Sequence, residues 1–307
     1  MSLMSNFPNG FANGVSVSGV PILNTYGGKV FWVSSTGGSD GNAGTHVRPF
    51  ATLNKAVSMC TASKGDIIML MPGHAENVTA ATSQVIDKAG VQVIGLGSGD
   101  LRPTFTYTAA SGSFEIDAAN VMIQNVKFLA GVEVTVGVNV DASGVKLSGC
   151  EWDWDADSDG FTIGVDVDAV HHVTIEGCTF IGDTADTDTG DLSAIRIDAA
   201  NHVKIIGNYI YGQFPNAAIS NDSGAAACAN LTIANNTIYN VDSDTGVGNV
   251  IDLHNACTGI IAYNNMGGLE STSVANLLDP GSCLCIQNYA VNAIDESAVI
   301  VPQAVST

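Results

Sequence analysis

The sequence predicts an all-β, single-domain β-solenoid in which parallel strands stack over about eight coils. Three observations predict it. A short pattern of alternating apolar residues ending in Gly or Asn recurs at intervals of about 24 to 30 residues. A second strand with period-two alternation precedes the repeats, as in Phe114-Glu-Ile-Asp and Ile195-Arg-Ile-Asp. No helical period runs between the strands, which are short and separated by Gly and Asn.

Residues 1–30 are predicted to form an extended N-terminal arm. The stretch from Asn6 to Leu23 is apolar, rich in turn-forming residues and uncharged, and it fits neither a disordered tail nor a solenoid coil. Such an arm needs a surface to lie on. A neighbouring subunit, a larger assembly and the chain's own coils all remain possible surfaces.

A helix over about residues 50–61 is predicted to cap the first coil. Pro49 precedes apolar residues at 50, 53, 56, 57 and 60, which is a helical spacing. The strand Ile67–Leu70 follows and ends at Pro72-Gly73. Because the end of a solenoid exposes unpaired strand edges, a covering element is expected there.

The coils occupy residues 31–290, and their recurring strand has three informative columns. The Gly or Asn column reads Gly95, Asn125, Gly149, Gly177, Gly207, Asn235 and Asn264, with a weaker copy at Asn288. The next column reads Val126, Cys150, Cys178, Asn208, Asn236 and Asn265, and its stacked amides predict hydrogen bonds along the solenoid axis. Two residues further on, an apolar stack reads Phe128, Trp152, Phe180, Ile210 and Ile238.

The C-terminal segment, residues 291–307, is predicted to close the last coil or to form a subunit contact. Seven cysteines, an odd number without a CxxC pair, indicate reduced and mostly buried thiols.

The charge balance excludes two classes of partner. Ten Lys and Arg residues against thirty Asp and Glu give a formal net charge of −20. Nucleic acid and anionic membranes are bound through dense Lys and Arg, so neither is expected as a partner. No apolar run approaches a membrane span. The N-terminus has neither a basic nor an apolar signal region, which predicts synthesis in a cytoplasm.

Outward positions of the second strand carry the residues that an enzyme of this architecture would use. They read Glu115, Asn139, Asp166, Arg196 and, after an irregular coil, Asp252. Glycoside hydrolysis needs two carboxylates. If the protein is an enzyme, Asp166, Arg196, Glu115 and Asp252 are the candidates. The alternative is that Asp166 and Arg196 form a solvated cross-strand ion pair on adjacent coils.

Two metal sites are conceivable, although no cofactor is required. Asp155, Asp157 and Asp159 precede Gly160, and Asp166 stands twelfth from Asp155, which resembles a Ca²⁺ loop. No helix pattern flanks this loop, so a solvated acidic loop is the competing interpretation. His172 and His202 share a turn column, where zinc ligation competes with simple ring stacking.

The segments GTHVRPFATLNKAVSMC and KGDIIMLMPGHAENV resemble the N-terminal cap and first coil of right-handed parallel β-helix proteins of the pectin-lyase-like superfamily. The resemblance implies right-handed coils. It does not choose a function, because this fold hosts enzymes, adhesins and virus parts. The superfamily's hydrolase signatures (Asn-Thr-Asp, Asp-Asp, Gly-His-Gly and Arg-Ile-Lys) are missing from the sequence, as is the lyase element Trp-Ile-Asp-His.

The arm, the cap and the missing export signal together resemble the β-helix virion proteins of tailed bacteriophages. That resemblance implies a non-catalytic capsid decoration or tail-associated protein, assembled as a homotrimer in the virion and folded in the host cytoplasm. Its partners would be other copies of itself and a capsid or tail surface. Two alternatives remain, a polysaccharide-degrading hydrolase or lyase of the tailspike kind and a glycan-binding adhesin or surface module.

Overall fold

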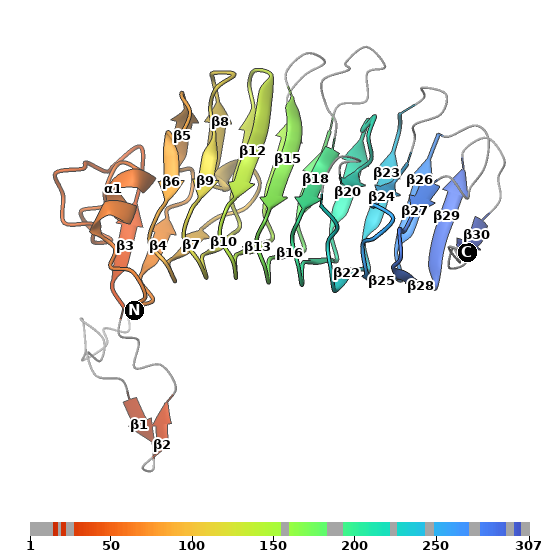
Figure 1. The fold of residues 1–307 in the computed structure, drawn as a ribbon. Coiled ribbons are helices and arrows are strands. Elements are labelled where there is room, and N and C mark those ends of the chain that lie inside the picture. Colours follow the sequence, from red (N-terminus) through yellow and green to blue (C-terminus); the bar gives the residue numbers. More distant parts are fainter. Residues whose placement is uncertain are drawn as a thin grey trace, which may run out of the picture.

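The computed structural model is an elongated right-handed parallel β-solenoid, as the sequence predicts (Figure 1). The structure describes residues 15–17, 20–22, 28–154, 160–182, 193–221, 226–242, 249–269, 277–292 and 298–301. Within these ranges, three sheets of ten, ten and eight strands run along the solenoid. The eight strands of the third sheet are close to the predicted number of coils.

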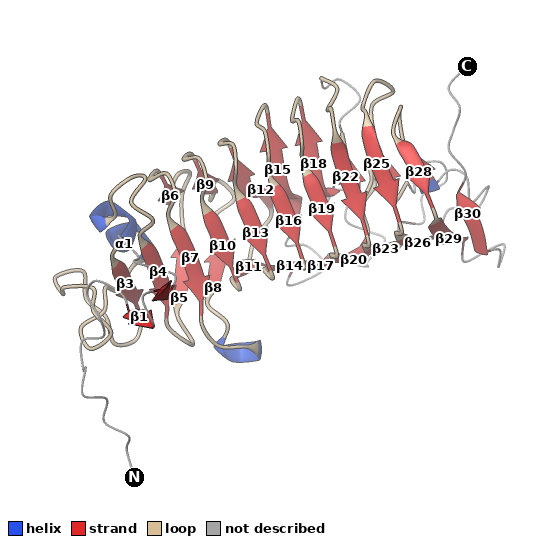
Figure 2. Cartoon of the chain, turned by 90° about the horizontal axis from the view of Figure 1, so that it is seen from below, coloured by secondary structure: helices blue, strands red, loops and turns tan. Residues whose placement is uncertain are grey.

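Each coil passes through the three sheets in turn, and neighbouring strands of a sheet belong to successive coils. The first sheet contains β3 (Val30–Val33), β4 (Ile67–Leu70), β7 (Gln92–Gly95), β10 (Met122–Gln124), β13 (Lys146–Ser148), β16 (Thr174–Glu176), β19 (Lys204–Ile206), β22 (Leu231–Ala234), β25 (Gly259–Ala262) and β28 (Leu284–Ile286). These strands are seen side by side in Figure 2.

The second sheet contains β5 (Ala75–Val78), β8 (Thr104–Tyr107), β11 (Lys127–Ala130), β14 (Glu151–Trp154), β17 (Thr179–Ile181), β20 (Tyr209–Gly212), β23 (Thr237–Asn240), β26 (Asn265–Gly268), β29 (Asn288–Asn292) and β30 (Ala298–Val301). The third sheet contains β6 (Gln84–Ile86), β9 (Phe114–Ile116), β12 (Val134–Val140), β15 (Phe161–Asp168), β18 (Ser193–Asp198), β21 (Ile219–Ser220), β24 (Ile251–Asp252) and β27 (Leu278–Asp279).

The core fills the inside of the solenoid, because alternate residues of every strand point inward. The predicted apolar stack is part of it: Phe128, Trp152 and Phe180 pair in register and are fully buried. Their rings lie 5.0 Å and 4.6 Å apart, centroid to centroid. All seven cysteines are free thiols and six of them are buried, in agreement with the prediction.

From Asn125 to Asn235 the Gly and Asn column forms the turn between the first and second sheets, where the backbone has a left-handed φ, whereas Gly95 ends strand β7 without one. Gly149, Gly177 and Gly207 adopt φ of 59°, 58° and 66°, and Asn125 and Asn235 follow at 55° and 56°. A residue without a Cβ, or one with a short amide side chain, adopts this conformation at least cost.

The last two repeats differ from the prediction by one residue. Leu231 pairs with Gly259 rather than with Ile260, so Tyr263 and not Asn264 takes the left-handed turn position, at φ 57°. Gln287 takes it in the following coil, at φ 46°. Asn264 instead points inward beside Asn236, and Asn265, which was predicted to stack there, is exposed.

The reason for this register is a buried ladder of asparagine side chains. Asn208, Asn236, Asn264 and Asn288 stack on successive coils, each at most 2% exposed. The Nδ2 of Asn236 donates to the carbonyl of Ile205 on the preceding coil at 2.9 Å and to Oδ1 of Asn264 on the next coil, also at 2.9 Å. Asn264 continues the pattern with Asn288 at 2.9 Å. These bonds outweigh the roughly 1–2 kcal/mol that a non-glycine residue costs in the left-handed region.

The cap helix α1 (Leu53–Met59) is shorter than predicted. Thr52 caps its N-terminus by accepting a hydrogen bond from the Lys55 amide at 3.2 Å. Phe50 is not helical, because it bridges to Val33 of β3 and is buried. The side of α1 that bears Leu53, Ala56 and Val57 is buried. A short 3₁₀ helix, η1 (Gly99–Leu101), also lies in a connection between coils.

The chain ends add two antiparallel pairs to the parallel coils. In the arm, β1 (Val15–Val17) pairs with β2 (Val20–Ile22), while most other arm residues lie outside the described ranges. At the other end, β30 turns back antiparallel onto β29 and ends the parallel stacking of the second sheet. A subunit contact of residues 291–307 stays a prediction. Among the helices described, none has the length and hydropathy of a membrane span.

Candidate functional site: an acidic strip on the third sheet

The outward positions of the third sheet gather carboxylates on successive coils. Glu115 lies in register with Asn139, which is followed along the same column by Asp166, Arg196 and Ser220. Two residues after each member of this column stands an aspartate, on four consecutive coils: Asp117, Asp141, Asp168 and Asp198. The acidic strip is defined here as Glu115, Asp117, Asp141, Asp166, Asp168 and Asp198.

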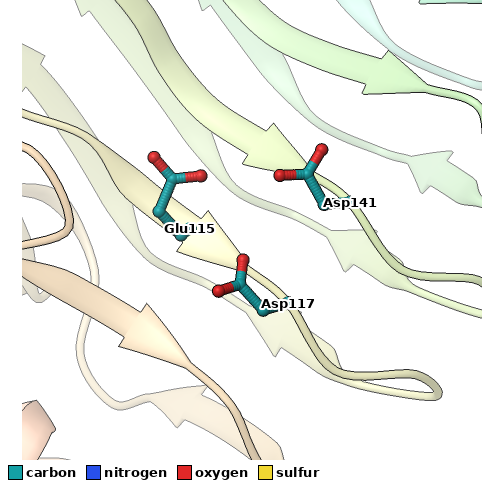
Figure 3. Close-up of side chains that lie close together, drawn as sticks. All are labelled: Glu115, Asp117 and Asp141. Atoms are coloured by element: carbon teal, nitrogen blue, oxygen red, sulfur yellow. The ribbon is translucent and has the colours of Figure 1, made fainter.

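The closest group within the acidic strip consists of Glu115, Asp117 and Asp141 (Figure 3). One carboxylate oxygen from each lies within 4.8 Å of the others. Asn139 donates from Nδ2 to Oδ2 of Asp141 at 2.8 Å. Desolvation raises the pKa of both aspartates, and the negative charge of Glu115 raises it further. Like charges at this spacing repel one another, so each carboxylate favours protonation of its neighbours.

Asp166 and Arg196 form a bidentate ion pair across adjacent coils. Arg196 donates from Nε to Oδ1 of Asp166 at 2.9 Å and from Nη2 to Oδ2 at 2.6 Å. The Asp166 side chain is 8% exposed and that of Arg196 is 32% exposed. A planar guanidinium that binds both carboxylate oxygens fixes the two coils in register.

The four residues proposed for an enzyme occupy one column but do not form one cluster. Asn139 separates Glu115 from Asp166, and Ser220 separates Arg196 from Asp252. Asp252 lies beside Asp279 instead. Desolvation and the charge of Asp279 raise the pKa of Asp252, whereas a hydrogen bond with Asn249 lowers it.

Sequence reasoning missed Asp117 and Asp141 as members of the carboxylate cluster. The signal was present in the sequence, since the four strands read Phe-Glu-Ile-Asp, Val-Asn-Val-Asp, Val-Asp-Val-Asp and Ile-Arg-Ile-Asp. The final Asp is two residues beyond the outward column, so it faces the same side of the sheet.

Most of the proposed calcium loop lies outside the described residues, which do not include Asp155, Asp157 and Asp159. Asp166 is described, and both of its oxygens accept from Arg196. In the structure the Asp166 carboxylate is thus engaged by Arg196 of the next coil.

Calcium binding to residues 155–159 stays a prediction with a direct measurement. Ca²⁺ is expected to raise Tm relative to chelator, because a hard cation that binds only the folded loop stabilises the fold. The variant Asp157→Ala should abolish the rise. Identical melting curves with Ca²⁺ and with chelator would contradict calcium binding.

His172 and His202 stack their rings 4.7 Å apart with an interplanar angle of 13°. Both residues have a left-handed φ, of 60° and 59°, in the turn between the third and first sheets. The lone pair of an imidazole nitrogen lies in the ring plane. Two nearly parallel planes cannot meet at one ion, so this geometry favours ring stacking over the zinc alternative.

The acidic strip makes a prediction about stability. Asp141→Asn is expected to raise Tm at pH 7, because it removes a charge repelled by Glu115, Asp117, Asp166 and Asp168 while keeping an acceptor for Asn139. The folded pKa of Asp141 is raised, so its ionisation disfavours folding above that pKa, and the penalty vanishes as pH falls toward the ordinary value of 3.8. Thermal melting from pH 3 to pH 8 measures it.

The matched control is Asp100→Asn, which removes one charge outside the acidic strip. If both variants changed Tm equally across the pH range, the gain would come from net charge and not from the strip. Added salt should reduce the difference between Asp141→Asn and the parent protein, since it screens exposed charges.

Comparison with known proteins gives a family. The model of DUF1565, a family described as proteins of unknown function, matches residues 36–293. The chain belongs to this family. The match spans nearly the whole solenoid of this DUF1565 protein, and the family description assigns no activity to it. No curated protein matches the chain.

Several solved structures are similar to this DUF1565 chain. A rhamnogalacturonan lyase shares 12% identity at a TM-score of 0.48, over 90% of this chain and 79% of the lyase. The GH136 lacto-N-biosidase from Eubacterium ramulus shares 12% at 0.46, over 86% and 60%. ORF18 of Geobacillus virus E2 shares 13% at 0.38, over 80% and 58%. The chain thus spans less than two thirds of the latter two, and similarities this low carry no argument about its activity.

Proposed function

We propose that the protein is a non-catalytic structural protein of a bacteriophage virion, assembled as a homotrimer on a capsid or tail surface. One observation carries the non-catalytic part. Four outward cations pair with carboxylates of other coils: Lys127–Asp153, Lys146–Glu176 and Arg196–Asp166 join adjacent coils, and Arg102–Glu151 joins coils two apart. Charge on this surface therefore links one coil to the next.

The ion pairs bear on the lyase alternative. A lyase that acts on uronates needs a base for proton abstraction and cations that neutralise the substrate carboxylate. On the third sheet the guanidinium of Arg196 is already bound to both oxygens of Asp166. The surrounding acidic strip would repel an anionic polysaccharide. Both features support a structural role.

The virion assignment extends the resemblance of the arm and cap to β-helix virion proteins. It is tested on particles from the strain that carries the gene, purified by density gradient and analysed by quantitative mass spectrometry. The protein is expected in the particles at a copy number divisible by three. Particles that lack the protein would overturn the assignment.

A second candidate function rests on the cluster of Glu115, Asp117 and Asp141. Retaining glycosidases place two carboxyl groups about 5–5.5 Å apart, and one of them stays protonated to act as the acid. The raised pKa of Asp117 and Asp141 suits the acid, and Glu115 would be the nucleophile. The cluster lies on an outward sheet face, within reach of a polysaccharide.

The hydrolase candidate is tested by the release of reducing ends from a panel of neutral and acidic polysaccharides. If it is correct, the parent protein and Asp100→Asn release sugar, whereas Glu115→Gln and the double variant Asp117→Asn/Asp141→Asn do not. If the parent protein releases none, hydrolysis is excluded. Binding to the same panel without turnover would favour the third alternative, a glycan-binding module.

A further inference from the structure

In the last three coils, the described strands of two sheets carry no charge. In the first sheet, β22, β25 and β28 contain no charged residue, and in the second sheet the same holds for β23, β26 and β29. This contrasts with the rest of the protein, whose net charge is −20. The charged residues of the strands in these coils, Asp252 and Asp279, lie on the third sheet.

The same two faces expose large apolar side chains, each between 42% and 51% exposed: Tyr239, Ile260, Tyr263, Leu284, Tyr289 and Val291. Ile260 and Leu284 are register neighbours on the first sheet, and Gly267 and Val291 on the second. Tyr263 occupies the turn between the two sheets. These six residues define the uncharged end face. Clustered exposed apolar residues of this kind mark interaction surfaces.

A shallow hollow makes the second-sheet part of this face uneven. Its volume is about 150 Å³, and its lining includes Tyr239, Gly267, Leu269 and Val291. The Tyr239 ring lies over Gly267, where any added Cβ would come within 2.5 Å of the ring atom Cδ1. The absence of a side chain at position 267 thus lets the Tyr239 ring lie close against the backbone beside the hollow, where an apolar side chain from a partner would contact it.

The net charge of the chain bears on the identity of that partner. Two copies that met through the acidic strip would bring like charges together, with a strong penalty in a poorly solvated contact. Contact through the uncharged end face keeps the acidic third sheets apart, in solvent and screened by salt. Tyrosine, three of whose side chains occur on this face, is enriched at protein interfaces.

We propose that the uncharged end face is the surface through which copies of this chain bind one another, an inference that rests on the proposed homotrimer. The face bends around the corner at Tyr263, so the molecule presents an apolar wedge with two sides. The side of one copy that bears Ile260 and Leu284 packs against the side of the next copy that bears Tyr239 and Tyr289. A heterologous contact of this kind closes into a ring when successive copies are related by a closed rotation, as in the proposed trimer.

The test is the mass in solution of the full chain, measured by light scattering in buffer containing about 0.15 M salt, an ionic strength close to physiological. The parent protein is expected at three times 31.5 kDa. Tyr239→Glu and Ile260→Glu, one on each side of the wedge, should each give the 31.5 kDa monomer. Val47→Glu makes the same chemical change at a residue that is 87% exposed in the cap region, and it should leave the trimer intact.

Unchanged circular dichroism of the variants establishes that they fold. A parent protein that stays monomeric at about 100 μM would overturn the inference, because a dissociation constant above that concentration is weak for a specific protein contact. So would a trimer that survives both wedge variants. A monomer that still occurs in purified particles would overturn this interface and leave the virion assignment standing. A trimer that is dissociated by both variants, from a protein absent from particles, would overturn only the virion assignment.

Discussion

Asn236→Ala is expected to lower the free energy of unfolding by about 3–5 kcal/mol, since it leaves several buried polar groups without partners at about 1–3 kcal/mol each. Asn236 is fully buried. Its Oδ1 accepts from the backbone amide of Asn208 at 2.9 Å and from Asn208 Nδ2 at 3.0 Å. Its Nδ2 donates to Ile205 and Asn264, both at 2.9 Å. Alanine removes all four hydrogen bonds at once.

Chemical denaturation with a spectroscopic readout measures the loss. The control is Asn265→Ala. It removes the same kind of side chain from an exposed position, next in sequence to the ladder residue Asn264. It should change stability by less than about 0.5 kcal/mol. Equal effects of the two variants would show that the buried ladder contributes nothing specific.

Trp152→Ala is expected to cost about 3–5 kcal/mol, because truncating a buried aromatic removes its contacts and leaves a cavity. Trp152 is fully buried between Phe128 and Phe180, at ring distances of 5.0 Å and 4.6 Å. The cavity would interrupt the aromatic stack in the middle of the solenoid, where neighbouring coils cannot move together to fill it.

Trp152→Phe separates ring stacking from the other contributions of tryptophan. The indole Nε1 is buried without a hydrogen-bond partner. Phenylalanine keeps a stacked ring and removes that unpaired donor, so the net change should stay within about 1.5 kcal/mol. Denaturant titration of both variants, with the exposed Leu101→Ala as control, measures the difference. A Trp152→Phe loss as large as that of Trp152→Ala would contradict the stacking argument.

Most of the solenoid could be predicted from the sequence, because period-two alternation and the recurring Gly or Asn report local backbone geometry directly. The register of the last coils could not. Asn is favoured both at a left-handed turn and in an inward ladder. The pair Asn264-Asn265 could therefore be aligned with the pair Asn235-Asn236, or shifted by one residue so that Asn264 lies beside Asn236. The hydrogen bonds of Asn264 to Asn288 and to the carbonyl of Ile233 decide between them, and those partners are 24 and 31 residues away.

The candidate site was predicted only in part. The pairing of Asp166 with Arg196 follows from strand alternation once the coils are aligned. The cluster of Glu115, Asp117 and Asp141 also depends on how two side chains of one strand end converge on a third from the next coil. Side-chain conformation sets that convergence, and the pattern of residue types along a strand does not encode it.

The asparagine ladder gives the solenoid a direction that its sheets alone do not have. Each amide nitrogen reaches back to a carbonyl of the preceding coil, and each amide oxygen receives donors from that same coil. Each asparagine of the ladder therefore makes the same contacts as the next one, so the coils that carry them are equivalent. Removal of residues 209–236 would join Asn208 to the coil of Thr237 and place it directly before Asn264, with the polarity of the remaining links preserved. A solenoid built this way can gain or lose whole coils during evolution, because each added coil continues the existing core and the existing ladder.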